Sequence, residues 1–217
     1  KDTTQFDLLF NLAYIRELEG KTQEAANLYC KAKTVAYEDA QKQNVNEAIS
    51  RIKSNNENIE IKEKSRIVFF VKAGMNNFFE DIIIGLSDDY WVRKITVSDF
   101  KQIDAGMEWA DVCWFEWCDE LIIYGSKLAL ARRKNVICRI PGSEICTEQI
   151  NKANWSNIDR VVVVDSHIKS LSPETILSLS NVEIDLFNEN HNSDGKINRV
   201  KGLIKDLILN SKKARDY

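Results

Sequence analysis

The chain of 217 residues is 44% hydrophobic and 29% charged, which is typical of a globular protein with one large and one smaller domain. Its formal net charge of −3 argues against nucleic acid as the main partner. No apolar run approaches the roughly 18 to 20 residues of a membrane span, and the polar start does not resemble a secretory signal, so we expect a cytoplasmic protein.

The first domain, expected over residues 1–60, has a helical period over 6–53, with no proline and one glycine, Gly20. The spacing of its small and apolar residues resembles a tetratricopeptide repeat, whose small residues let two helices approach closely. We expect a helical hairpin that turns at Gly20-Lys21, followed by a third helix over about 36–53. A lone repeat leaves one face unburied, so the hairpin is predicted to contact the third helix, the next domain, further repeats or a protein partner.

The second domain, expected over residues 61–217, begins after a polar linker. From Arg66 on, apolar segments typical of buried strands alternate with segments of helical period. Strands are expected at 67–71, 90–97, 112–115, 136–139, 160–165 and 182–184. Helices are expected at 76–86, after Ser98 as a cap, after Asp119, at 148–153 and at 196–215. This alternation predicts a Rossmann-like α/β fold, a parallel sheet with helices on both faces.

The last expected helix carries its apolar residues on one stripe. They are Ile197, Val200, Leu203, Ile204, Leu207 and Ile208, with lysine and arginine elsewhere. A closing helix that docks on the sheet has this pattern, and so does a basic helix that lies on an anionic membrane. Docking is the favoured interpretation. The alternative is a peripheral contact at the inner face of the membrane.

The strand at 112–115 runs directly into Glu116, Trp117, Asp119 and Glu120, three carboxylates beside an indole. Ligands of open parallel sheets bind beyond the carboxyl ends of the strands. We therefore predict a binding site that includes Glu116 and Trp117. The structural alternative is that Trp117 packs a helix onto the sheet and Asp119 caps that helix.

Two other turns follow expected strands. Gly74 and Asn76 lie where a helix opens, and its backbone N–H groups suit a phosphate. One glycine is fewer than the three of a dinucleotide fingerprint, so neither NAD nor FAD is expected. Arg139 and Glu144 flank a Pro-Gly turn, where they can hold a polyol or phosphate or can bond each other.

We predict that Glu116, Trp117, Arg139 and Glu144 gather at one edge of the sheet. The five cysteines are widely spread, without a Cys-x-x-Cys pair, and the only histidines are His167 and His191. Reduced core thiols are expected, and no metal, cofactor, disulfide or histidine-based triad.

Together, residues 66–190 resemble the N-terminal half of GT-B glycosyltransferases, of the large retaining family that uses nucleotide-sugar donors. The match runs through 110–120 (ADVCWFEWCDE), Ser126, 139–144 (RIPGSE), 154–159 (NWSNID) and 165–168 (DSHI). The resemblance implies two Rossmann-like domains, of which this one binds mainly the acceptor. It implies that Glu116 and Arg139 contact acceptor hydroxyls or phosphate, that Gly74 approaches the donor diphosphate, and that no metal is needed.

The chain departs from the family in two ways. Relatives commonly have a His-Ser-Tyr-Glu-like run where this chain has Pro-Gly-Ser-Glu at 141–144, and the spaced glutamate pair of the donor domain is not found after Glu144. The catalytic residue is therefore not identified. Since the first residue is Lys1, we expect a part of a longer glycosyltransferase, inactive alone, which transfers sugar from a nucleotide sugar to a glycan, lipid or protein.

Two alternatives stay open. One is a non-catalytic scaffold, in which the tetratricopeptide-like hairpin binds a partner and the sheet domain is a relic. The other is a flavodoxin-like or receiver-like signalling domain, which is disfavoured because no acidic pair follows the first strand.

Overall fold

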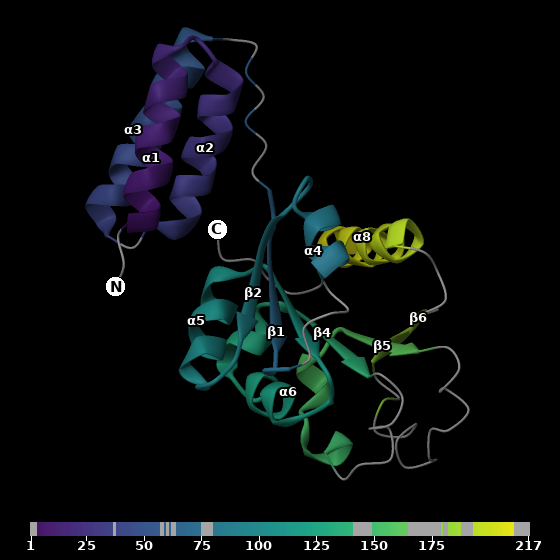
Figure 1. The fold of residues 1–217 in the computed structure, drawn as a ribbon. Coiled ribbons are helices and arrows are strands. Elements are labelled where there is room, and N and C mark those ends of the chain that lie inside the picture. Colours follow the sequence, from purple (N-terminus) through teal and green to yellow (C-terminus); the bar gives the residue numbers. More distant parts are fainter. Residues whose placement is uncertain are drawn as a thin grey trace. The chain divides into compact units, whose positions relative to one another are not determined.

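The computed structural model describes residues 4–36, 38–56, 59, 61, 64–74, 80–140, 149–164, 179, 182–187 and 193–210. The chain divides into two units, Lys1–Lys64 and Ser65–Tyr217. The first consists of three helices and the second contains one sheet with its covering helices (Figure 1).

The first unit contains α1 (Thr4–Leu18), α2 (Thr22–Val35) and α3 (Asp39–Asn55). Gly20 has a φ of 74° in the turn between α1 and α2, which explains a glycine at the predicted turn. Small side chains dominate the core between the helices, where Ala13, Ala25, Ala26, Ala32 and Ala48 are buried. The structure therefore has the helical hairpin and the third helix, whereas the likeness to a tetratricopeptide repeat stays a prediction.

Glu17 of α1 connects all three helices of this unit. Its carboxylate accepts two hydrogen bonds from Arg51 of α3, both 2.9 Å long, and one from the Tyr29 hydroxyl of α2, also 2.9 Å. The hydrogen bonds from Arg51 lower the pKa of Glu17, against the opposing effect of burial. A single carboxylate thus fixes the relative positions of α1, α2 and α3.

The second unit is built on six strands that all run parallel. They are β1 (Arg66–Val71), β2 (Trp91–Thr96), β3 (Val112–Glu116), β4 (Asn135–Ile140), β5 (Arg160–Val164) and β6 (Glu183–Phe187). Their order in the sheet is β2-β1-β3-β4-β5-β6. The predicted parallel sheet of a Rossmann-like α/β fold is confirmed.

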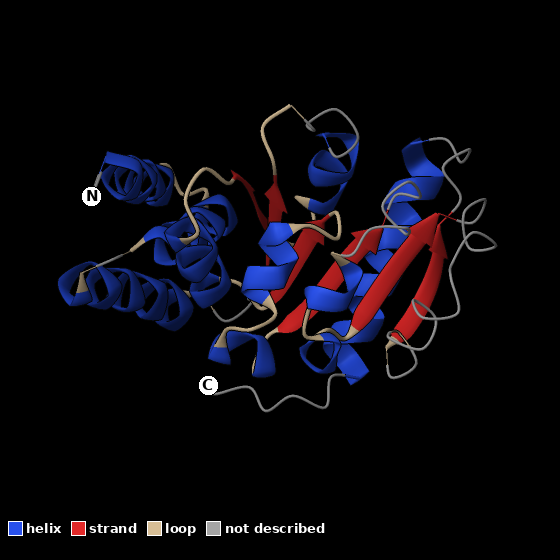
Figure 2. Cartoon of the chain, turned by 90° about the horizontal axis from the view of Figure 1, so that it is seen from below, coloured by secondary structure: helices blue, strands red, loops and turns tan. Residues whose placement is uncertain are grey.

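Helices cover both faces of this sheet (Figure 2). One face packs against α4 (Glu80–Leu86) and α8 (Ser193–Asn210). The other packs against α5 (Lys101–Trp109), α6 (Glu120–Gly125) and the 3-10 helices Ala129–Arg132, Ile150–Lys152 and Trp155–Asn157. The chain moves from β1 to β2 in one direction and from β2 on to β6 in the other. Right-handed crossovers, the rule in parallel sheets, place helices on opposite faces when the direction changes, and α4 accordingly lies on one face and α5 and α6 on the other.

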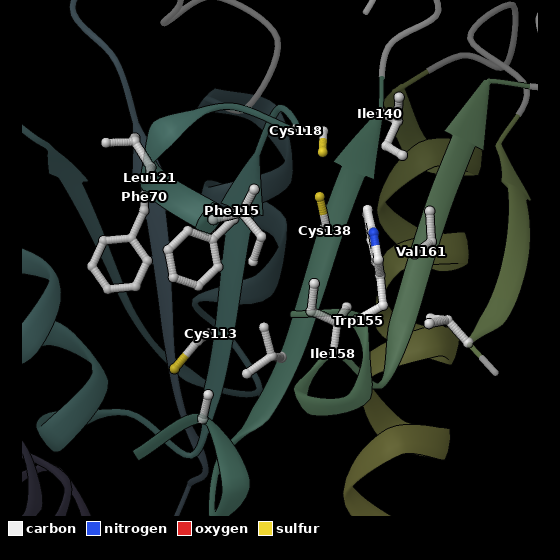
Figure 3. Close-up of a cluster of buried hydrophobic side chains, with 14 of the residues drawn as sticks. Phe70, Cys113, Phe115, Cys118, Leu121, Cys138, Ile140, Trp155, Ile158 and Val161 are labelled. Atoms are coloured by element: carbon white, nitrogen blue, oxygen red, sulfur yellow. The ribbon is translucent and has the colours of Figure 1, made fainter. Parts of the chain in front are cut away.

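The two cores differ in composition. Figure 3 shows part of the core under α5 and α6, where Phe70 and Phe115 stack with ring centroids 4.7 Å apart and Trp155 covers β4 and β5. The core under α4 and α8 contains Trp114 and Phe69, whose rings lie 5.5 Å apart. Both faces of β3 are thus fully buried, as its apolar sequence predicts.

The tail helix docks on the sheet, as the favoured interpretation predicted. Val200, Ile204 and Leu207 of α8 are buried against the sheet, and the other members of the predicted stripe pack around them. Within the described part of the chain, no helix has the length and apolar character needed to cross a membrane.

One local prediction was wrong. Ser98 does not cap the following helix, because the side chain that accepts from the N–H of Lys101, the first residue of α5, is the carboxylate of Asp99, at 2.9 Å. The short helix expected at 148–153 is, in its described part, the 3-10 helix Ile150–Lys152.

Candidate functional site

The carboxyl ends of β1 and β3 mark the point where the direction of the crossovers reverses, because β1 lies between β2 and β3. Such switch points are where open α/β sheets bind ligands. Lys72 directly follows β1, and its Nζ lies 3.1 Å from the carboxylate of Asp119 and 2.6 Å from that of Glu120, which both follow β3. A cluster of one cation and two carboxylates therefore bridges the two strand ends.

The two carboxylates of this cluster differ in environment. Asp119 is the N-cap of α6 and accepts a hydrogen bond of 2.8 Å from the Leu121 N–H, as the structural alternative predicted. Burial raises the pKa of Asp119, against the opposing effects of Leu121 and Lys72. The hydrogen bond from Lys72 lowers the pKa of Glu120, which is more exposed. Burial lowers the pKa of Lys72, but its hydrogen bonds to Glu120 and Asp119 outweigh burial and leave it raised.

A cavity of about 540 Å³ opens beside this cluster, at the carboxyl ends of β1, β2 and β3. It is lined by Lys72, Ala73, Val97, Ser98, Asp99, Phe100, Glu120 and Leu121. The Phe100 ring stacks on Tyr124, with centroids 4.5 Å apart and an interplanar angle of 8°, and the Tyr124 hydroxyl donates to Asp104 at 3.1 Å. The side chains of Tyr124 and Asp104 therefore fix the position of the Phe100 ring in the cavity wall.

Lys72 and the segment 97–100 were not predicted as site residues. The signal was present, because 97–100 follows an expected strand just as 116–120 does. What the sequence could not supply was the adjacency of the two segments, which depends on β1 lying between β2 and β3.

Glu116 and Arg139 face each other across β3 and β4. They are Cα partners in the strand pairing, and Nη1 of Arg139 donates to Oε1 of Glu116. The Nε1 of Trp114 donates to the second carboxylate oxygen of Glu116 at 3.2 Å. Glu116 is 2% exposed and Arg139 3% exposed, so the structure brings both predicted residues together at one edge of the sheet as a buried pair.

Trp117 follows Glu116 with a φ of 88°, in the left-handed region that a bulky residue rarely adopts. Its N–H donates to the Arg139 carbonyl at 3.0 Å, which extends the pairing of β3 with β4 by one bond. The bend at Trp117 turns Cys118 back over the sheet, where its sulfur points toward that of Cys138 (Figure 3). Left-handed conformations of this kind cost of order 1–3 kcal/mol and cluster at ligand sites.

The cysteines of the described part, Cys30, Cys113, Cys118 and Cys138, are all buried thiols. Burial raises the pKa of the Cys138 thiol, with a further contribution from the Cys118 side chain. A buried thiol with a raised pKa is a weak nucleophile, so the pair in Figure 3 belongs to the core.

Gly74 has a φ of 86°, and a Cβ built on it would meet no atom within 4 Å. The backbone conformation therefore accounts for glycine at this position. Asn76, Glu144 and Cys146 lie outside the described residues. Among the described residues, no group of three or more histidine, cysteine, aspartate and glutamate side chains could hold a metal ion.

No protein-family model, no curated protein and no solved structure matches this chain.

Proposed function

We propose that this chain is the acceptor-side half of a glycosyltransferase, which transfers a sugar from a nucleotide sugar to a glycan, lipid or protein acceptor when it is joined to a donor-binding domain. The observation that carries the proposal is the cavity of mixed polar and apolar lining at the switch point of a parallel Rossmann-like sheet. The motifs at 110–120 and 139–144, which resemble the retaining GT-B family, contribute the end of β3 and the end of β4 at that same edge.

In this proposal, Glu116 and Arg139 position the edge rather than react. Glu116 is 2% exposed and Arg139 is 3% exposed, and the two form a buried salt bridge. This salt bridge connects the ends of β3 and β4. The groups that reach an acceptor from the cavity are Lys72, Ser98, Asp99 and Glu120. Asn76 and Glu144 stay ligand candidates on their sequence position, and Gly74 stays the candidate for the donor diphosphate.

The experiment is a transfer assay on the product of the full reading frame, with UDP- and GDP-sugars as donors and glycans, glycolipids and peptides as acceptors. We expect transfer, loss of transfer in Glu120→Gln, and full activity in the control Glu108→Gln, which changes an exposed carboxylate at the other end of α5. Calorimetry on residues 1–217 should give nucleotide-sugar dissociation constants of roughly millimolar or weaker, because one glycine turn offers few diphosphate contacts. Micromolar binding would mean that the donor site lies on this chain. Absence of transfer from every donor that the longer protein binds would overturn the proposal.

A scaffold is the second candidate, and the outer face of α1 favours it. Leu8, Leu12, Ile15 and Leu18 of this helix are 67%, 37%, 49% and 71% exposed, while Phe6 and Ala13 are buried in the helical core. An exposed apolar stripe at helical spacing suits contact with another protein segment. If the protein is a scaffold, the double variant Leu8→Lys with Ile15→Lys should abolish its biological effect. The variant Glu120→Gln should leave that effect unchanged. A transferase predicts loss of transfer in Glu120→Gln alone.

A further inference from the structure

We infer that the cavity at the ends of β1, β2 and β3 takes the hydroxyl groups of an uncharged sugar and disfavours phosphorylated ligands. The inference rests on the proposed function only where it calls this sugar the acceptor. Of the possible acceptors, namely glycan, lipid and protein, it selects the uncharged terminal sugar of a glycan. An acceptor sugar linked to a lipid through phosphate is disfavoured, because its phosphate would contact the same cavity lining.

The charge of the lining is the first argument. Among the described residues that line the cavity, Lys72 is the one cation and Asp99 and Glu120 are the two carboxylates, for a formal charge of −1. Lys72 is itself paired with Asp119 at 3.1 Å and with Glu120 at 2.6 Å, so its charge is neutralised. The next residues along the chain, 75–79 (MNNFF), carry no charged side chain. Among the described lining residues, an added phosphate would meet net negative charge and no cation without a carboxylate partner, whereas phosphate sites in proteins provide arginine, lysine or several free N–H groups.

The chemistry of the lining is the second argument. Glu120 and Asp99 offer carboxylate oxygens that accept hydrogen bonds from sugar hydroxyls, and Ser98 offers a hydroxyl that both donates and accepts. Phe100 is 42% exposed and presents a ring whose other side is stacked on Tyr124. The C–H face of a sugar ring packs on such an aromatic surface while its hydroxyls reach the polar groups.

The cavity also has the right size and rigidity. Its volume of about 540 Å³ lies within the range of small-molecule sites. The loop that carries Ser98 and Asp99 is fixed by the Gln102 side chain, and the Asp99 carboxylate accepts from the Lys101 N–H at 2.9 Å. The polar groups are therefore held in place before any ligand arrives, which lowers the cost of binding.

The test is a titration of the whole chain, followed by amide nitrogen–proton NMR, with glucose, galactose and mannose and with the 6-phosphate of each. We expect at least one neutral hexose to shift the amides of Ser98, Phe100 and Leu121 with a dissociation constant of about 1–20 mM. Its 6-phosphate should bind about tenfold or more weakly, because the carboxylates of Glu120 and Asp99 repel the negatively charged phosphate group. Equal or tighter binding of the phosphates would overturn the inference, and so would absence of shifts at these amides with every sugar.

Isosteric variants test the electrostatic cause. Asp99→Asn with Glu120→Gln removes two charges, keeps the shapes and leaves Lys72 facing Asp119 alone, so the preference should change toward the 6-phosphate. The control Glu108→Gln should keep the wild-type preference. A double variant that still prefers the neutral sugar would show that charge does not set the selectivity and that the inference is wrong.

The outcomes separate this inference from the proposed function. Sugar binding in the cavity, without transfer by the full-length protein, would overturn the transferase and leave a sugar-binding site. Transfer to a phosphorylated acceptor, without shifts in the cavity, would overturn the inference and leave the transferase.

Discussion

Lys72 and Glu120 lie 48 residues apart in the chain, yet Nζ of Lys72 is 2.6 Å from the Glu120 carboxylate. The pair spans the ends of β1 and β3, where the direction of the crossovers reverses, and both of its residues line the cavity. A salt bridge with one side chain 32% and the other 52% exposed contributes little to stability. The salt bridge matters instead for ligand binding, because it neutralises Lys72, the one lysine among the described residues that line the cavity.

The Glu116 and Arg139 pair should be needed as a pair. Replacing one partner by a neutral residue, as in Arg139→Met, leaves an uncompensated buried charge and is expected to lower the free energy of unfolding by about 3–5 kcal/mol. Replacing both, Glu116→Leu with Arg139→Met, should recover most of that loss. Urea unfolding of the single and double variants measures the coupling. Equal losses in the single and double variants would contradict the expectation.

Trp117 should tolerate glycine better than alanine. Both substitutions remove the indole, but only glycine adopts the φ of 88° without strain. We expect Trp117→Gly to be more stable than Trp117→Ala by about 1 kcal/mol in urea unfolding. A more stable alanine variant would mean that the left-handed conformation at this position is lost when the indole is removed.

Two helical glycines give a matched test of the close packing of α4 against α8. A Cβ on Gly85 would lie 2.7 Å from the Ile197 side chain, whereas a Cβ on Gly202 would meet no atom within 4 Å. Gly85→Ala should therefore destabilise by about 1–3 kcal/mol, through overpacking. Gly202→Ala should stabilise by about 0.5–1 kcal/mol, through helix propensity. Thermal unfolding of both variants measures the two signs, and stabilisation by Gly85→Ala would show that α8 can move away from α4.

The helical unit should lose stability in acid through Glu17. Hydrogen bonds from Arg51 lower the pKa of Glu17 in the folded state. Its contribution is therefore present above its unfolded pKa of about 4.3 and is lost as the pH falls through the lower, folded value. We expect about 1 kcal/mol, since Arg51 is half exposed. Hydrogen exchange of α3 amides at pH 7 and in acid measures it, and Glu17→Gln should remove this part of the pH dependence. An unchanged profile in Glu17→Gln would contradict the assignment.

The sequence by itself determined the elements and the class of fold. The apolar runs from β1 to β5 and the stripe on α8 are local patterns whose period shows which face is buried, so the parallel sheet and the docking of α8 followed from them. Asp119 as the cap of α6 was equally local, because it depends on a residue two positions ahead. Ser98 was misassigned because Asp99, one residue further on, supplies the carboxylate that accepts from the first N–H of α5.

Only the tertiary structure decided which strand ends meet. The order β2-β1-β3-β4 places the segment 97–100 and Lys72 beside 119–121, and it places Arg139 opposite Glu116. Strand order depends on pairings between residues far apart in the chain, which no local period encodes. The sequence therefore identified polar residues after its strands, while the cavity, the buried pair and the neutralised lysine arise from long-range pairing.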